Sequence, residues 1–281
     1  MTARRFHQLD VFTEVPLRGN PLAVVHGAEG LDAARMQAFA RWMNLSETAF
    51  LLPPTDPTAD YRVRIFTTSR ELPFAGHPTL GSCHAWLLAG GQPRDADEVV
   101  QECGVGQVRI RRDAGRLAFA APPLRRSGPV EPEVLARIVR ALRIDAAAVR
   151  AAQWVDNGPG WVAVMLASRQ ALLDIDPDYT AMDGLEIGVV APWPGVSADE
   201  PAQFEVRAFI STSGVPEDPV TGSLNAGLAQ WLIGAGLAPP RYVASQGTAL
   251  GRAGRVHVEQ VGDTIWVGGA SVVCIEGEVR L

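Results

Sequence analysis

Three side chains of this sequence have the chemistry and the neighbours that proton transfer requires. Glu47 is followed by the mostly apolar stretch 48–52, and burial beside apolar groups raises the pKa of a carboxyl group toward neutrality. His77 lies at the expected start of a helix, where the positive end of the helix dipole keeps the pKa of an imidazole low. Asp218 precedes a second expected helix. A carboxyl group and a neutral imidazole tuned in this way can act as general acid and base.

Each of these residues also has an ordinary structural interpretation. Glu47 could be a solvated residue at the end of a helix, and Asp218 could be a helix N-cap. His84 is expected within the same helix as His77 and is interpreted as a core residue rather than a metal ligand. The remaining histidines are interpreted as structural or surface residues (His7, His26, His257).

Two loops of similar composition, 75–79 and 218–223, lead into expected helices. The first N–H groups of a helix have no partner within it, and the helix dipole favours negative charge there. Gly76 and Gly222 would let a ligand approach the backbone closely, and Thr79 and Ser223 add hydroxyl donors. Two such helix starts predict that the protein binds a carboxylate.

The composition excludes several kinds of chemistry. All 25 basic residues are Arg, so neither a lysine Schiff base with pyridoxal phosphate nor a phosphate-binding loop that needs lysine can form. The three cysteines are scattered without a C-x-x-C pair, so neither a disulfide framework nor a zinc site is expected. Signatures of dinucleotide-binding, serine-hydrolase and zinc-protease sites are also missing. We therefore expect no cofactor and no metal ion.

The charge of the chain points to a small-molecule partner. The formal net charge is -6 and the pI is about 5.4, which makes nucleic acid and anionic membranes poor candidates. No apolar run reaches the roughly 18 residues that a membrane-spanning helix needs, and the first residues do not resemble a secretion signal. We expect a cytoplasmic protein.

The predicted elements place these residues at the ends of strands and helices. After Asp32, apolar residues recur at helical spacing until a helix end near Asn44, and a strand follows at 48–52. Glu47 is therefore expected where the helix passes into the strand. A second helix is predicted to begin at Pro78, because proline is well tolerated at the first helical position. The apolar positions of the first helix are Met36, Phe39, Ala40 and Met43.

The two halves of the chain share a weak internal repeat. An offset of 143 places Val63, Arg64 and Phe66 on Val206, Arg207 and Phe209, and an offset of 145 places Trp86 on Trp231. The segment 121–132 contains four prolines and is the expected linker between two lobes. We predict an N-terminal lobe at 1–121, completed by a strand at 268–281, and a C-terminal lobe at 122–267. A pseudo-twofold axis would bring the helix starts of both lobes toward one cleft.

Several blocks of the sequence resemble the PhzF-like phenazine-biosynthesis family. They lie at 44–50, 64–67, 71–79 and 217–223, and the blocks 10–12 and 19–21 and the last strands are similar too. The resemblance spans nearly the whole chain. It implies the α+β fold of diaminopimelate epimerase, in which each of two pseudo-symmetric lobes wraps a mostly antiparallel sheet around a central helix.

The resemblance also implies roles for residues. Glu47 corresponds to the general acid/base of the family, with His77, Asp218, Gly222 and Ser223 as partners in the site, and Asn20 joins the candidate binding residues. The named phenazine enzyme moves a double bond in a dihydro-hydroxyanthranilate by proton transfer without metal or organic cofactor. Epimerases of this fold use paired cysteines, and the corresponding blocks 75–77 and 219–222 contain none. Departures from the family at Thr68, Leu224 and Ala253 leave the natural substrate open.

The leading hypothesis is a homodimeric, cofactor-independent isomerase of a small amino- or hydroxy-carboxylate. It would catalyse double-bond isomerisation or epimerisation by proton transfer through Glu47, His77 and Asp218. The alternative is a carboxylate-binding protein that retains the cleft without turnover. A third interpretation, metal-assisted hydrolysis through His77 and Asp218, would require a bound metal ion.

Overall fold

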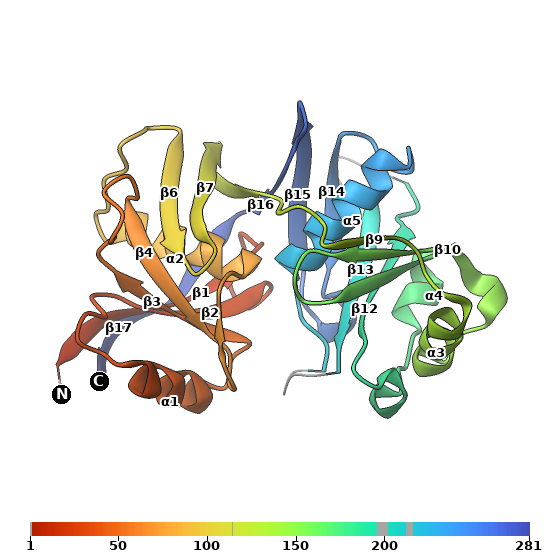
Figure 1. Cartoon of the computed structure of the whole chain (residues 1–281), viewed down its shortest axis with the longest axis horizontal. Helices are drawn as coiled ribbons and strands as arrows, with labels where there is room; N and C mark the ends of the chain where they lie inside the picture. The colour runs from red at the N-terminus through yellow and green to blue at the C-terminus, as the bar shows by residue number, and fades with distance from the viewer. Residues whose placement is uncertain (1, 114, 196–201, 212–215) are drawn as a thin grey trace. The chain divides into compact units, whose positions relative to one another are not determined.

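The structure is a computed structural model that describes residues 2–113, 115–195, 202–211 and 216–281. The chain divides into two compact units (Figure 1). The first unit contains Met1–Ala120 and Gly268–Leu281, and the second contains Ala121–Val267. The C-terminal segment therefore belongs to the same unit as the N-terminal strand.

The first unit contains a mixed sheet with the strand order β17–β1–β2–β3–β4–β6–β7–β8. The pairs β2/β3 and β4/β6 are parallel and the others are antiparallel, while the short β5 pairs with β4. The bounds are β1 (Ala3–Val11), β2 (Asn20–Val25), β3 (Glu47–Leu52), β4 (Tyr61–Phe66), β5 (Glu71–Leu72), β6 (Glu98–Cys103), β7 (Gly106–Asp113), β8 (Arg116–Ala120) and β17 (Ser271–Arg280).

Helix α2 (Gly76–Leu88) is the central helix of this unit and contacts seven of its strands, β1, β2, β3, β4, β6, β8 and β17. It begins at Gly76, two residues before the predicted start. Gly81 permits this close packing, because a Cβ at that position would come within 2.6 Å of Leu22 and 2.9 Å of Val11. Leu22 and Val11 therefore point from the sheet toward α2.

Helix α1 (Ala33–Met43) packs against β3 and β4 through a separate apolar cluster. The predicted limits of this helix are confirmed. Asp32 is the N-cap and accepts a hydrogen bond from the Arg35 N–H at 2.7 Å, and Asn44 is the C-cap in the left-handed region with φ 55°. The cluster includes Met36, Phe39, Ala40, Phe50 and Phe66.

The strand register places two candidate site residues on the side of the sheet that faces α2. Paired residues of neighbouring strands project from the same face. Leu22 pairs with Glu47 and Val11 pairs with Asn20. Because Leu22 and Val11 contact α2, the side chains of Glu47 and Asn20 point to the same side, where α2 begins.

The second unit has its own mixed sheet with the order β9–β10–β11–β12–β13–β14–β15. Its strands are β9 (Arg126–Pro129), β10 (Val149–Asp156), β11 (Trp161–Leu166), β12 (Glu186–Pro192), β13 (Phe204–Ile210), β14 (Arg241–Gln246) and β15 (Gly254–Val261), and β16 (Thr264–Gly269) follows. Its helices are α3 (Pro132–Leu142), α4 (Arg169–Leu173) and α5 (Gly222–Gly234), with 3-10 turns at Ala146–Ala148, Tyr179–Met182 and Thr248–Leu250.

The strand pairings of the two units follow the same series, which agrees with the internal repeat seen in the sequence. In each unit the first six pairs are antiparallel, antiparallel, parallel, antiparallel, parallel and antiparallel. Helix α5 takes the place of α2, and Gly227 takes the place of Gly81. A Cβ at Gly227 would lie 2.3 Å from the carbonyl oxygen of Val155 on β10, the counterpart of β1.

The proline-rich segment 121–132 contains a strand that the sequence analysis did not predict. Strand β9 pairs antiparallel with β10, and Pro129 lies opposite Gln153 at its end. Proline is tolerated on an edge strand, where the position of the missing N–H can face away from the neighbouring strand. The amino-acid composition of this segment indicated only a linker, because composition carries no information about which strands pair.

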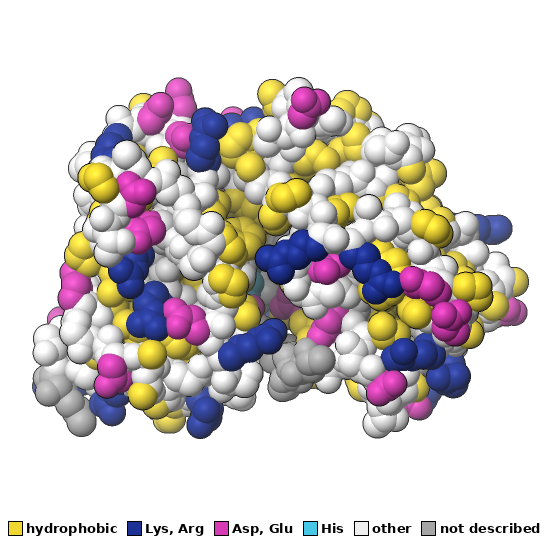
Figure 2. Space-filling view, viewed as in Figure 1, with side chains coloured by type: hydrophobic (Ala, Val, Ile, Leu, Met, Phe, Trp, Pro, Cys, Tyr) yellow, Lys and Arg dark blue, Asp and Glu magenta, His cyan; other side chains and the backbone are white. Residues whose placement is uncertain are grey.

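Charges of both signs are distributed over the surface. On the face shown in Figure 2, arginine side chains (dark blue) and acidic side chains (magenta) are interspersed. This distribution fits the modest net charge of -6. Among the described residues, no helix combines the length and the apolar character that crossing a membrane requires.

Equivalent ion pairs precede the central helix in both units. Arg207 on β13 donates through Nε and Nη2 to Glu217 at 2.9 and 2.8 Å, and both side chains are 6% exposed. Arg64 on β4 makes the same two bonds to Glu71 at 2.7 Å each, but Glu71 is 41% exposed. The segments 71–76 and 217–222, which begin with these two glutamates, both have the sequence Glu-x-Pro-x-x-Gly. Each pair therefore ties the loop that leads into a central helix to a strand.

We predict that Glu217→Gln destabilises the protein far more than Glu71→Gln. Removing one partner of a buried ion pair leaves an uncompensated charge and costs about 3–5 kcal/mol, whereas an exposed pair contributes about 0–1 kcal/mol. Urea unfolding of the two variants, with the wild type beside them, measures the difference. Equal shifts of the unfolding midpoint would show that burial does not separate the two pairs.

Candidate active site

Glu47 and His77 meet in the first unit, at the start of β3 and the start of α2. Nε2 of His77 lies 3.5 Å from Oε2 of Glu47, and the side chains are 5% and 16% exposed. Among the described residues, His77 Nε2 is a buried nitrogen without a hydrogen-bond partner. The structure thus places two of the three predicted catalytic residues within one small, largely buried cluster.

The environment of His77 keeps its imidazole neutral. Burial lowers the pKa of His77 to about 3, and a hydrogen bond with the backbone of Pro21 offsets only part of this effect. Nδ1 of His77 lies 3.4 Å from Nδ2 of Asn20. The predicted direction of the pKa shift is confirmed, but its main cause is desolvation rather than the helix dipole. A neutral imidazole carries one donor and one acceptor nitrogen.

Asn20 reaches this cluster because of the turn that precedes β2. A Cβ at Gly19 would lie 2.3 Å from the carbonyl oxygen of Val11, so only glycine allows the chain to pass this close to β1. The Gly19 N–H points toward Oδ2 of Asp10 at 3.4 Å. The next residue is Asn20, which is fully buried and begins β2.

Gly76 and Thr79 form the start of α2, and the hydroxyl of Thr79 is used within the protein. It donates to the carbonyl oxygen of Ala75 at 2.9 Å and accepts from Gln101 at 3.1 Å. Thr79 is fully buried. Its only hydroxyl proton therefore stabilises the helix start, and its contacts give no support for the predicted role in binding a ligand.

Asp218 lies in the second unit, in the loop before α5, and is 7% exposed. Its Oδ2 accepts a hydrogen bond from the hydroxyl of Thr221 at 2.7 Å. The N-cap of α5 is Thr221, not Asp218. The capping interpretation of Asp218 is therefore wrong, and its carboxylate is instead tied to the capping residue.

A buried glutamine that the sequence analysis missed organises this loop. The side-chain oxygen of Gln246 accepts from the Thr221 N–H at 3.0 Å and from Asn225 at 2.9 Å. Its Nε2 donates to the Thr221 hydroxyl at 2.9 Å and to the Asp218 carbonyl oxygen at 3.1 Å. Gln246 ends β14 outside any recognisable motif, so no signal in the sequence would have found it.

Helix α5 begins at Gly222, one residue before the start that the sequence predicted at Ser223. Gly222 is buried, while Ser223 is half-buried. The Ser223 hydroxyl accepts from the indole N–H of Trp161 at 2.9 Å, and the Ser223 carbonyl oxygen accepts from Asn157 at 2.8 Å. The first unit thus carries Glu47, His77 and Asn20, and the second carries Asp218 and the start of α5. In the described parts of the chain, no group of three or more His, Cys, Asp or Glu side chains could hold a metal ion.

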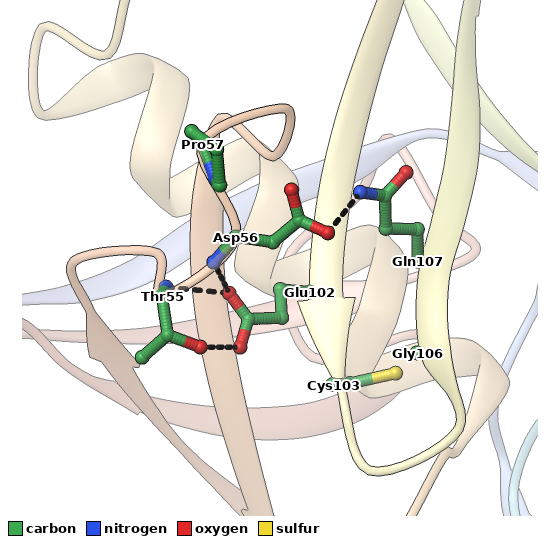
Figure 3. A pocket seen from close by; sticks show the side chains of 7 residues that line it. All are labelled: Thr55, Asp56, Pro57, Glu102, Cys103, Gly106 and Gln107. Carbon is green, nitrogen blue, oxygen red and sulfur yellow. Dashed lines mark hydrogen bonds between the residues drawn. The ribbon is translucent and has the colours of Figure 1, made fainter.

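A surface pocket of the first unit offers a different polar cluster (Figure 3). Its central carboxylate, Glu102, accepts from the backbone N–H groups of Thr55 and Asp56 at 2.6 and 3.0 Å and also from the Thr55 hydroxyl. Gln107 donates to Asp56 at 2.8 Å, and burial raises the pKa of the Cys103 thiol. These groups hold a turn together and include no activated nucleophile. The contact between Glu47 and His77 is the better candidate for catalysis.

Comparison with known proteins identifies the class to which this fold and these residues belong. The chain matches the family described as "PhzC-PhzF: Phenazine biosynthesis-like protein" over residues 9–277, and it is a member of that family. A crystal structure of a PhzF-family protein from Enterococcus faecalis is similar with a TM-score of 0.82 and 25% identity, and the match covers 100% of both chains. The predicted α+β fold class is confirmed.

Two relatives match the chain over nearly its whole length, and the name of the first gives the class of activity. "Trans-2,3-dihydro-3-hydroxyanthranilate isomerase" of Pseudomonas aeruginosa is 32% identical over 288 residues, which cover 99% of each chain. "Antisense-enhancing sequence 1" of Schizosaccharomyces pombe is 34% identical over 297 residues, again 99% of each chain. The protein is an isomerase of the PhzF family.

We predict that His77 makes the protein less stable in acid. The pKa of this imidazole is about 3 in the folded chain and 6.5 in its unperturbed form. Between these values the unfolded state binds more protons, so folding stability falls as the pH drops from 6.5 toward 3. His77→Gln removes this titration and should lose less stability than the wild type between about pH 7 and about pH 4.5.

Urea-unfolding midpoints of both proteins at the two pH values measure the effect. His26, whose pKa burial lowers to about 4, titrates with the same sign, and His26→Gln is the matched comparison. An acid loss that is identical in wild type and His77→Gln would contradict the buried, neutral state of His77.

Proposed function

We propose that this isomerase moves a proton between carbon atoms of a small amino- or hydroxy-carboxylate, with Glu47 as the general acid/base. The observation that carries the proposal is the contact between Glu47 and a buried, neutral His77 at 3.5 Å. The Glu47 carboxylate is largely buried and lies beside an imidazole that is uncharged. It can therefore take a proton from carbon and return it.

The proposed reaction proceeds in two proton transfers. Glu47 removes a proton from a carbon that is alpha or vinylogous to the substrate carboxylate, and the electron pair of the C–H bond delocalises toward that carboxylate. The protonated Glu47 then returns the proton to another carbon, or a second acid protonates the opposite face of the same carbon. The first outcome is double-bond isomerisation and the second is epimerisation, and neither consumes a co-reactant.

We propose that the loop before α5 binds the polar groups of the substrate. The first N–H groups of α5 and the Ser223 hydroxyl would hold the carboxylate, because unpaired amides and the helix dipole favour negative charge. Asp218 would bind an amino or hydroxyl group, because a carboxylate accepts hydrogen bonds from such donors, and the Thr221 hydroxyl orients this carboxylate through a bond of 2.7 Å. Asn20, Gly76 and Gly222 are the remaining proposed binding residues.

The relative from Pseudomonas aeruginosa suggests which compounds to test first. Its name describes a substrate with amino, hydroxyl and carboxylate groups on a partly reduced ring. We propose substrates of this class, and a homodimer as the working assembly. The natural substrate of the present chain would be identified by screening such compounds in deuterated water, where an isomerase incorporates deuterium from solvent.

We predict that Glu47→Gln abolishes most of this exchange while the protein remains folded. A positioned general base contributes about 10²–10⁴ in rate, so the variant should lose at least roughly a hundredfold. The assay follows deuterium incorporation into trans-2,3-dihydro-3-hydroxyanthranilate or its product by NMR. Glu98→Gln is the control, because Glu98 is a carboxylate of similar exposure, 21%, that is bonded to Arg109. Exchange by Glu47→Gln at the wild-type rate would refute the role of Glu47.

A further inference from the structure

Ser223 is held by two side chains to which the proposed function assigns no role. Trp161, at the start of β11, donates its indole N–H to the Ser223 hydroxyl oxygen at 2.9 Å. Asn157, which follows β10, donates from Nδ2 to the Ser223 carbonyl oxygen at 2.8 Å. Trp161 is 2% exposed. Its strand therefore fixes the position from which the indole N–H reaches Ser223.

The donor and acceptor roles in the hydrogen bond between Trp161 and Ser223 determine where the serine hydroxyl proton can point. An indole nitrogen can only donate, so the Ser223 oxygen must be the acceptor. The hydroxyl has a single proton, which must then point away from Trp161. Among the described residues the Ser223 hydroxyl donates to none, and Ser223 is half-buried. The hydroxyl proton is available to a ligand.

Thr79, close to the start of the central helix in the first unit, shows the opposite arrangement. Its hydroxyl accepts a hydrogen bond from Gln101 and donates one to the carbonyl oxygen of Ala75, four residues earlier. Such bonds back to the preceding turn are common for Ser and Thr in helices. Ser223 has no such bond among the described residues, so its hydroxyl keeps the capacity to donate to a ligand.

We infer that Trp161 is a positioning residue that turns the Ser223 hydroxyl proton toward the carboxylate of the ligand. This inference rests on the proposed function, in which Ser223 binds that carboxylate. Without the indole N–H, the hydroxyl would rotate freely and could present its lone pairs to an anion. The indole N–H fixes this direction before the ligand arrives, and a preorganised donor binds more tightly than a mobile one.

The test is a double-mutant cycle on ligand affinity. Isothermal calorimetry with 3-hydroxyanthranilate, a stable aromatic compound that carries carboxylate, amino and hydroxyl groups, measures Kd for the wild type, Ser223→Ala, Trp161→Phe and the double variant. Ser223→Ala should weaken binding roughly tenfold or more, because it removes a hydrogen bond to a charged group. Trp161→Phe should weaken it severalfold, and it should add no further loss in the Ser223→Ala background.

Trp154→Phe is the matched control. Its indole N–H is also bonded within the second unit, but to Glu131 at 2.9 Å, and the residue is 6% exposed. The Kd of this variant should equal that of the wild type. Loss of affinity in Trp154→Phe, or an equal loss from Trp161→Phe with and without the Ser223 hydroxyl, would show that the indole supports only the packing of the unit.

The remaining outcomes separate this inference from the proposed function. If Ser223→Ala weakens binding but Trp161→Phe does not, only the positioning role of Trp161 fails. If Ser223→Ala binds as the wild type does, or the wild type does not bind 3-hydroxyanthranilate, the proposed carboxylate site fails and the inference fails with it. If Trp161→Phe does not fold, the indole N–H resonance of Trp161 is followed by NMR instead. It must shift when the ligand is added to the wild type, and it must remain unchanged in Ser223→Ala.

Discussion

The close packing of a central helix against its own sheet is the constraint on which the site depends. Gly81 lets α2 lie so near to β1 and β2 that a single methyl group would collide with Leu22 and Val11. The start of α2 is thereby brought to strand side chains that share the face of Leu22, and Glu47 is its register partner on β3. A longer distance between helix and sheet would separate Glu47 from His77. The contact between Glu47 and His77 is therefore a result of core packing.

The same arrangement of strand, loop and central helix occurs in both units, but the polar side chains at the start of the two helices differ. Both loops read Glu-x-Pro-x-x-Gly, and both are tied to a strand by an arginine. After the final glycine, the first copy has His77 and the second has Ser223. The first copy places an imidazole beside a carboxylate, whereas the second supplies a hydroxyl and backbone amides. Duplication would therefore have given one stable scaffold whose copies could specialise, one in proton transfer and the other in binding an anion.

The sequence predicted those parts of the structure that depend on local pattern. The limits of α1 follow from its N-cap and apolar spacing, and the two helix starts follow from glycine and proline positions. The contact between Glu47 and His77 was expected only through the family resemblance, since it depends on strand register and packing. The contacts of Gln246 and Trp161 could not be predicted, because their side-chain hydrogen bonds join residues that are 21 to 62 positions apart in the chain. The cause of the low His77 pKa was misassigned because burial of a helix start cannot be seen in a local motif.

The strand β17 has a consequence for the order in which the chain can fold during synthesis. It pairs with β1 over the whole length of that strand, from Ala3 opposite Arg280 to Val11 opposite Ser271. The ribosome makes residues 121–267 before this strand. The second unit can therefore complete its fold while the edge of β1 that will bind β17 is still unpaired. The first unit closes last, because two of its paired strands, β1 and β17, are separated in the chain by the whole second unit. Until then, a nascent-chain chaperone has an unpaired β-strand edge to protect.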